Sequence, residues 1–194
     1  MAKQMWKPGT LLYPVPAVMV SCKNSEGINN IITVAWTGIV CSDPAMLYVS
    51  IRPERYSYDM IKETGSFVVN LPNRSLAYAL DFCGVKSGRD INKFEHLGLT
   101  AQKSNQVDAP GIEECPVNLE CRVKQIIPLG SHDMFIGEIL CVDVEDALLD
   151  KSGKLHLNKA DLICYSHGEY RALADSLGTF GFSVRKKPVR KEKK

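Results

Sequence analysis

Two short segments of the chain carry side chains that could bind a ring system and a phosphate. Residues 29–38 read Asn-Asn-Ile-Ile-Thr-Val-Ala-Trp-Thr-Gly, and residues 50–53 read Ser-Ile-Arg-Pro. The first segment offers hydroxyl groups and an indole, and the second offers a guanidinium that can form paired hydrogen bonds with a phosphate. Together they suit a ligand with a flat, partly apolar ring and a charged tail, as in a flavin nucleotide.

The elements that must position these residues are mostly strands. Short apolar runs alternate with turn signals at close spacing, which predicts a mainly β structure with short helices. Ser57 is expected to cap a short helix that ends before Gly65, and Gly84 is expected to end a second one. Because a closed or nearly closed barrel leaves no exposed strand edges, we expect that arrangement. The expected strands are 15–22, 31–40, 45–51, 67–71, 117–127, 134–144 and 162–165, and the expected helices lie near 58–62, 75–83 and 94–96.

Length and composition favour one globular domain over residues 1–184. The chain has 194 residues, of which 45% are hydrophobic and 24% are charged, close to the averages for globular proteins. It contains neither an apolar run long enough to cross a membrane nor an apolar signal core near its first residues. We therefore expect a cytoplasmic protein with no membrane partner.

The end of the chain is strongly basic. Residues 185–194 hold seven of the 24 Lys and Arg residues, so the formal net charge of +2 hides an acidic body. Such a tail could contact nucleic acid or an anionic surface. A disordered, solvated terminus is the preferred interpretation, and the absence of a known nucleic-acid-binding signature predicts no nucleic-acid partner.

The seven cysteines show neither metal-site nor disulfide spacing. No two of them form a Cys-x-x-Cys pair, and their number is odd, which disfavours zinc, iron–sulfur and disulfide frameworks. Several alternate with apolar neighbours and are expected to be small core residues. Only Cys41 and Cys83 are expected near a functional site, and no metal is expected.

The order of several short motifs resembles one known family, the flavin reductase-like proteins with an FMN-binding split β-barrel, and within it the flavoredoxins. The resemblance implies a six-stranded antiparallel Greek-key barrel, a homodimer that holds FMN near the subunit interface, and a redox role. The motifs are Pro-Val-Pro-Ala at 14–17, Asn-Ile-Ile-Thr-Val-Ala-Trp at 30–36, Ser-Ile-Arg-Pro at 50–53, Phe-Val-Val-Asn-Leu-Pro at 67–72, Ser-Gly-Arg-Asp at 87–90, Lys-Phe at 93–94, Gly-Ser-His at 130–132 and Phe-Ile-Gly-Glu at 135–138.

The resemblance assigns most of the cofactor contacts to the two opening segments. Backbone groups of residues 33–35 would follow the ring edge and Trp36 would border it, although Trp36 could instead be a core aromatic. Arg52 is expected to hold the phosphate, with Arg55 as a rival and Arg89 as a weaker candidate. The cofactor-binding residues predicted in these segments are Asn30, Thr33, Val34, Ala35, Trp36, Ser50, Ile51 and Arg52, and those predicted outside them are Ser57, Ser87 and Arg89.

Three further residues are predicted at the site. Lys93 could stabilise negative charge on a reduced flavin, or it could be a solvated surface charge. His132 follows Gly-Ser where many relatives have Gly-Asp, so its imidazole would be less firmly oriented; the alternative is a loop histidine bonded to backbone. Tyr165 could face the flavin or pack at the barrel rim. Lys93 and His132 are the two residues expected to act on the reaction itself.

Three functions remain open from the sequence. The first is a flavin or ferric reductase that takes hydride from NADH or NADPH onto FMN. The second is a flavoredoxin-like electron-transfer protein, whose tightly bound FMN is reduced by a protein partner. The third is a basic-tailed binding module without redox activity. The sequence does not distinguish FMN as a prosthetic group from FMN as a substrate.

Overall fold

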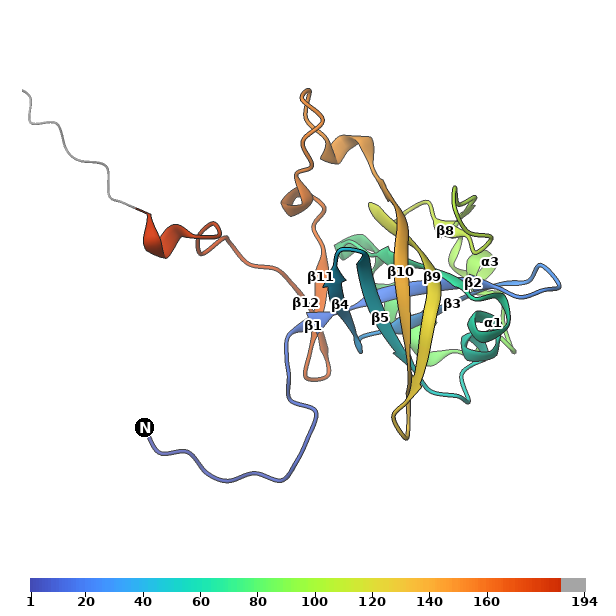
Figure 1. Cartoon of the computed structure of the whole chain (residues 1–194), viewed down its shortest axis with the longest axis horizontal. Helices are drawn as coiled ribbons and strands as arrows, with labels where there is room; N and C mark the ends of the chain where they lie inside the picture. The colour runs from blue at the N-terminus through green and yellow to red at the C-terminus, as the bar shows by residue number, and fades with distance from the viewer. Residues whose placement is uncertain (186–194) are drawn as a thin grey trace, which may run out of the picture.

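The computed structural model describes residues 1–185, so apart from Arg185 the predicted disordered tail lies outside the described residues. Short helices lie beside a mainly antiparallel β structure, and the segment after the last strand extends away from the body (Figure 1). The strands are β1 (Val15–Pro16), β2 (Val18–Lys23), β3 (Asn29–Val34), β4 (Thr37–Ser42), β5 (Ala45–Ile51), β6 (Ser66–Leu71), β7 (Ala101–Gln102), β8 (Gly111–Ile112), β9 (Val117–Pro128), β10 (Asp133–Val144), β11 (Ile163–Ser166) and β12 (Glu169–Ala172). The α-helices are α1 (Tyr56–Thr64), α2 (Ala77–Val85) and α3 (Lys93–Leu97), and short 3-10 helices lie at Arg74–Leu76, Asp146–Leu148, Leu157–Lys159 and Phe182–Val184.

Seven strands form the main sheet in the order β3-β2-β6-β9-β10-β5-β4, and every neighbouring pair is antiparallel. The predicted hairpin of the two long strands is confirmed, with Asp133 paired to Pro128 and Val144 paired to Val117. Two smaller sheets, β1-β11-β12 and β7-β8, flank it. The mainly β prediction is therefore confirmed.

The sheet has seven strands where six were predicted, because the single strand expected at 31–40 is broken. Its first part pairs with β2 and its second part pairs with β5, at opposite ends of the sheet. Only Ala35 and Trp36 separate β3 from β4, so the two ends of the sheet must come together at this corner. The Trp36 carbonyl accepts a hydrogen bond of 2.9 Å from the Ser50 backbone N–H. The sheet curls but does not close as a barrel, which corrects the expectation of closure.

Both faces of β2 are buried, which explains its nearly continuous apolar sequence. Val18, Val20 and Cys22 point into a core that includes Phe67 and Phe135. On the other face of β2, Met19 packs in a second core against α2 and α3, and the Ser21 hydroxyl donates to the Pro110 carbonyl. The expectation of core thiols is confirmed for Cys22 and Cys121, which are both buried, as are Cys83 and Cys115.

The helix boundaries confirm one predicted signal and correct two. Gly65 ends α1 in the left-handed conformation, with φ of 67°, as a glycine after a helix commonly does. Ser57 does not cap α1: the cap is Arg55, and Ser57 lies inside the first turn. Gly84 does not end α2, which continues to Val85. Gly84 allows close packing instead, because a Cβ there would lie 3.1 Å from the Cβ of Thr33.

Beyond β11 the structure contains a strand that the sequence did not predict. Residues 169–172 form β12, which pairs with β11 after the turn at His167 and Gly168. The turn is tight because both residues have positive φ, 48° and 92°. In the described part of the chain, no helix is long and apolar enough to cross a membrane.

Candidate functional site

Three adjoining cavities lie where β3 meets β4. We call them the cationic cavity (about 300 Å³), the tryptophan cavity (about 160 Å³) and the apolar cavity (about 530 Å³). The first two share Ile32 and Arg55, and the last two share Ala35, Trp36, Ser50 and His132. The cavities therefore form one continuous trough along β3 and the corner that follows it.

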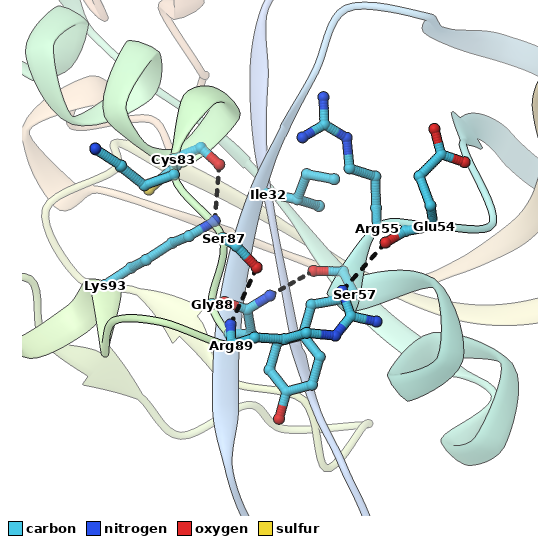
Figure 2. A pocket seen from close by; sticks show the side chains of 12 residues that line it. Ile32, Glu54, Arg55, Ser57, Cys83, Ser87, Gly88, Arg89 and Lys93 are labelled. Atoms are coloured by element: carbon cyan, nitrogen blue, oxygen red, sulfur yellow. Dashed lines mark hydrogen bonds between the residues drawn. The ribbon is translucent and has the colours of Figure 1, made fainter.

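The cationic cavity lies between the start of α1 and the loop after α2, with β3 between them (Figure 2). Arg55, Lys86, Arg89 and Lys93 line it, against one acidic residue, Glu54. Arg55 caps α1 without a side-chain capping bond, and the Tyr58 backbone N–H already donates to the Arg55 carbonyl. The backbone N–H groups of Tyr56 and Ser57 are the ones at the helix start that can bond an anion. This donor set is typical of a phosphate site.

Asn30 and Ser57 are buried together in this cavity. The Asn30 amide donates a 2.8 Å hydrogen bond to the Ser57 hydroxyl, which joins β3 to the first turn of α1. Gly88 packs directly against this pair: a Cβ there would overlap the Asn30 amide and lie 2.9 Å from the Tyr56 ring. A glycine is therefore needed for the loop to approach so closely.

Arg89 crosses from the loop after α2 to the segment before α1. Its guanidinium donates a 3.1 Å hydrogen bond to the Glu54 carbonyl and lies 5.1 Å from the centre of the Tyr56 ring. The Ser87 hydroxyl accepts a 3.2 Å hydrogen bond from the Arg89 backbone N–H. These contacts hold the loop and the start of α1 on facing sides of the cavity (Figure 2).

Lys93 is not the solvated charge that one interpretation expected: only 3% of it is exposed. Its ammonium donates a hydrogen bond of 2.6 Å to the Ile31 carbonyl and one of 2.8 Å to the Cys83 carbonyl (Figure 2). Burial lowers the pKa of Lys93 from its ordinary value. Lys93 thus ties β3 to α2 while lining the cationic cavity. The thiol of Cys83 stays protonated at neutral pH, because burial raises its pKa to about 11.

The tryptophan cavity is lined by four consecutive residues, 33–36, at the end of β3. Trp36 is half-buried and belongs to none of the hydrophobic clusters of the described residues, so the core alternative is wrong. The Thr33 hydroxyl donates to the Leu80 carbonyl and is therefore not free for a ligand. Since β3 is an edge strand, its outward backbone groups can bond a ring in the cavity.

Arg52 and His132 lie together in the tryptophan cavity rather than in the cationic one. The Arg52 guanidinium is 3.5 Å from the Glu54 carboxylate, and both side chains are largely exposed. Burial and the nearby Arg52 charge lower the pKa of His132, so its imidazole is neutral at pH 7. Its Nδ1 lies 2.9 Å from the Ser131 hydroxyl.

Of the predicted site residues, Tyr165 alone lies outside the three cavities. Its ring is 5.8 Å from Tyr13, which in turn is 6.2 Å from Trp36. Tyr165 thus packs against Tyr13, and Tyr13 packs against Trp36. The other predicted residues line the first two cavities. Asn30, Ser57, Ser87, Arg89 and Lys93 line the cationic cavity, and Thr33, Val34, Ala35, Trp36, Ser50, Ile51, Arg52 and His132 line the tryptophan cavity.

Sequence reasoning missed some of the residues that line the trough. Tyr56 and Lys86 line the cationic cavity, and Arg55, considered only as a rival, lines two cavities. The basic residues flanking Ser87 and Gly88 were the available signal. Cys41 lines none of the three cavities, so only Cys83 of the two suspected cysteines lies at the site.

Comparison with known proteins agrees with this geometry. Residues 10–174 match the model of the flavin reductase like domain. The chain belongs to the flavin reductase-like family. An uncharacterised protein of Archaeoglobus fulgidus is 39% identical over 160 residues, which cover 81% of this chain and 87% of that protein.

Solved structures of this family share the fold. The flavoredoxin of Desulfovibrio vulgaris (Miyazaki F) is 33% identical, with a TM-score of 0.88 over 95% of this chain and 100% of that one. A putative flavin reductase with a split barrel domain from Shewanella frigidimarina is 22% identical, with a TM-score of 0.78 over 87% of this chain and 86% of that one. The predicted family and the split-barrel fold are therefore confirmed.

Proposed function

We propose that this flavin reductase-like chain is an FMN-binding oxidoreductase that transfers electrons through its bound flavin. One observation carries the proposal: residues from separate segments of the sequence come together as a cationic cavity joined to a smaller cavity bordered by Trp36. A dianionic phosphate and a flat ring need these two environments side by side.

The phosphate would occupy the cationic cavity. Arg55 and Arg89 can offer guanidinium groups, Ser57 and Ser87 can offer hydroxyls, and the uncapped start of α1 can offer N–H groups. Gly88 fits this role, because a side chain there would displace Asn30 and Tyr56 from the cavity wall. Arg52, the residue first expected to hold the phosphate, would instead border the ring, and this assignment remains to be tested.

The ring would lie in the tryptophan cavity, against Trp36 and the backbone of residues 33–35. Bound FMN supplies the redox chemistry, since its ring accepts and releases electrons. The protein groups bind and orient the ring and limit the access of water. Lys93 holds β3, which would border the ring, through the Ile31 carbonyl and adds positive charge to the cationic cavity.

The electron donor divides the two candidate functions. A reductase must bind NADH or NADPH beside the ring, and the diphosphate of such a donor requires cations. The apolar cavity, which adjoins the ring position, has no Lys or Arg among its described lining residues. This feature, together with 33% identity to a flavoredoxin over most of the chain, favours the electron-transfer protein with tightly bound FMN over the NAD(P)H-dependent reductase.

The visible spectrum of the protein tests both parts of the proposal. Protein purified without added flavin should be yellow and should release FMN on denaturation. When NADH or NADPH is added under anaerobic conditions, the yellow colour should persist for many minutes if a protein partner is the electron donor. Prompt bleaching would support the NAD(P)H-dependent reductase. A colourless protein that does not take up added FMN would refute FMN binding and favour the binding module.

We also propose that the chain forms a homodimer. The edge strand β4 exposes Ile39 and Val40, which are 65% and 48% accessible. Apolar side chains on an unpaired edge invite contact with a second copy. Sedimentation velocity should give twice the chain mass, and Ile39→Lys should shift the protein towards the monomer. A monomeric wild-type protein at high concentration would contradict the proposal.

A further inference from the structure

The apolar cavity is the largest of the three and adjoins the proposed ring position. Its walls come from several parts of the chain: residues 9–12 before β1, Tyr48 on β5, Leu129 in the β9–β10 loop and Met134 on β10. It shares Trp36 and His132 with the tryptophan cavity. A molecule bound here would therefore contact the same indole that borders the proposed ring position.

Charge separates the two ends of the trough. Four basic residues line the cationic cavity, whereas the described residues lining the apolar cavity include no Lys, Arg, Asp or Glu. Its volume of about 530 Å³ is in the usual range for small-molecule sites. Because its described lining residues offer no cation to pair with a phosphate or a carboxylate, the cavity favours an uncharged molecule.

The polar groups at the cavity favour a carbonyl on that molecule. His132 is neutral at pH 7, because burial and Arg52 lower its pKa, and a neutral imidazole has one donor and one acceptor nitrogen. The Ser131 hydroxyl, 2.9 Å from Nδ1, can donate to that nitrogen. In the tautomer that accepts this bond, the proton lies on Nε2, which can donate to a ligand oxygen. An aspartate at position 131 could only accept from Nδ1–H, which would leave Nε2 as the acceptor.

We propose that the apolar cavity binds an uncharged, flat, carbonyl-bearing compound of the quinone or conjugated enone class, whose carbonyl oxygen accepts a hydrogen bond from Nε2 of His132. The use of this compound in a redox reaction rests on the proposed function, but its binding does not require FMN. Its binding can therefore be measured on the full chain with and without FMN.

Trp36 provides the reporter for this measurement. The chain has two tryptophans, and Trp6 is exposed, so Trp6→Phe leaves Trp36 as the single indole. In this background, menadione should quench the fluorescence saturably, with one site per chain. Naphthalene should bind more weakly, and NADH should neither quench at similar concentrations nor compete with menadione. Saturating FMN should leave a menadione site in place, because the ring and menadione occupy adjoining cavities.

Two variants locate the site. His132→Ala should weaken menadione about fivefold, the usual value of one hydrogen bond, and leave naphthalene unchanged. Leu129→Asp places a charge in the apolar cavity alone and should weaken menadione by more than fivefold. Leu155→Asp makes the same change at an exposed loop position outside the three cavities and should have no effect.

Three binding results would overturn this inference: non-saturable quenching by menadione, NADH binding as tightly as menadione, or displacement of menadione by FMN. Two results with variants would also overturn it: an equal loss of menadione and naphthalene binding in His132→Ala, or equal effects of Leu129→Asp and Leu155→Asp on menadione binding. The proposed function, which requires FMN binding, is tested independently of this inference. If the expected menadione pattern appears in a chain that does not bind FMN, the cavity assignment stands and FMN binding is refuted.

Discussion

The position of the phosphate can be tested through Arg55, which lines both the cationic and the tryptophan cavities. Arg55→Gln keeps a hydrogen-bonding side chain and removes one positive charge. A hydrogen bond to a charged group contributes about 1.5 to 3 kcal/mol. Since Arg55 is exposed, the lower end applies, and we expect FMN to bind about tenfold more weakly. Riboflavin lacks the phosphate and should change less than about twofold.

Titration of the flavin-free protein, followed by flavin fluorescence, gives both affinities. Lys62→Gln is the matched control, because it removes one charge from the opposite end of α1, outside the three cavities. The loss in Arg55→Gln should shrink as salt is added, since surface charges are screened. Equal weakening of FMN and riboflavin, or an unchanged FMN affinity, would refute the phosphate assignment. The same pair of ligands applied to Arg52→Ala would show whether Arg52 also contacts the phosphate.

Three further predictions concern the framework of the site. Lys93→Met should lower the free energy of unfolding by about 2 kcal/mol in urea, because the Ile31 and Cys83 carbonyls lose a charged donor; an unchanged midpoint would contradict this. Gly88→Ala should weaken FMN more than riboflavin, because its Cβ displaces Asn30 from the wall of the cationic cavity, whereas an exposed Gly153→Ala control should not; unaltered binding in Gly88→Ala would show that the loop simply shifts. His132 has a lowered pKa, so the unfolded chain takes up its proton first as pH falls below about 6.5. Wild-type stability relative to His132→Gln should therefore fall between pH 7.5 and 5, and a pH-independent difference would count against burial of the neutral ring.

Local signals predicted many of the elements. The strand expected at 45–51 is observed with the same bounds, and Gly65 ends α1 as expected. These signals depend on neighbouring residues: a proline and an arginine bound the strand, and only a glycine readily adopts the left-handed conformation after the helix. Signals that depend only on residues adjacent in the chain can be recognised in a single sequence.

Long-range contacts explain the errors. Residues 31–40 look like one strand locally, but their partners, β2 and β5, lie at opposite ends of the sheet. Gly84 has the composition of a helix C-terminus, but it is a glycine because it packs closely against Thr33. Ser57 has the composition of a cap but bonds to Asn30, 27 residues earlier. No local pattern contains these pairings.

The sequence predicted which residues belong to the site better than it predicted where each of them lies. The motifs identified many of the residues that line the first two cavities, but not which cation lies in which cavity. Arg52 follows β5 and reaches the tryptophan cavity, whereas Arg55, three residues later, begins α1 and reaches the cationic cavity. The burial of Lys93 depends on carbonyls of β3 and α2 and could not be inferred from its position on a short helix.

A crystal structure of the protein with FMN tests the central claim most directly. We predict the phosphate in the cationic cavity, within hydrogen-bonding distance of Arg55, Ser57 or Arg89, and the ring against Trp36 and the backbone of residues 33–35. A phosphate bound elsewhere, or a trough that stays empty at saturating FMN, would contradict the account.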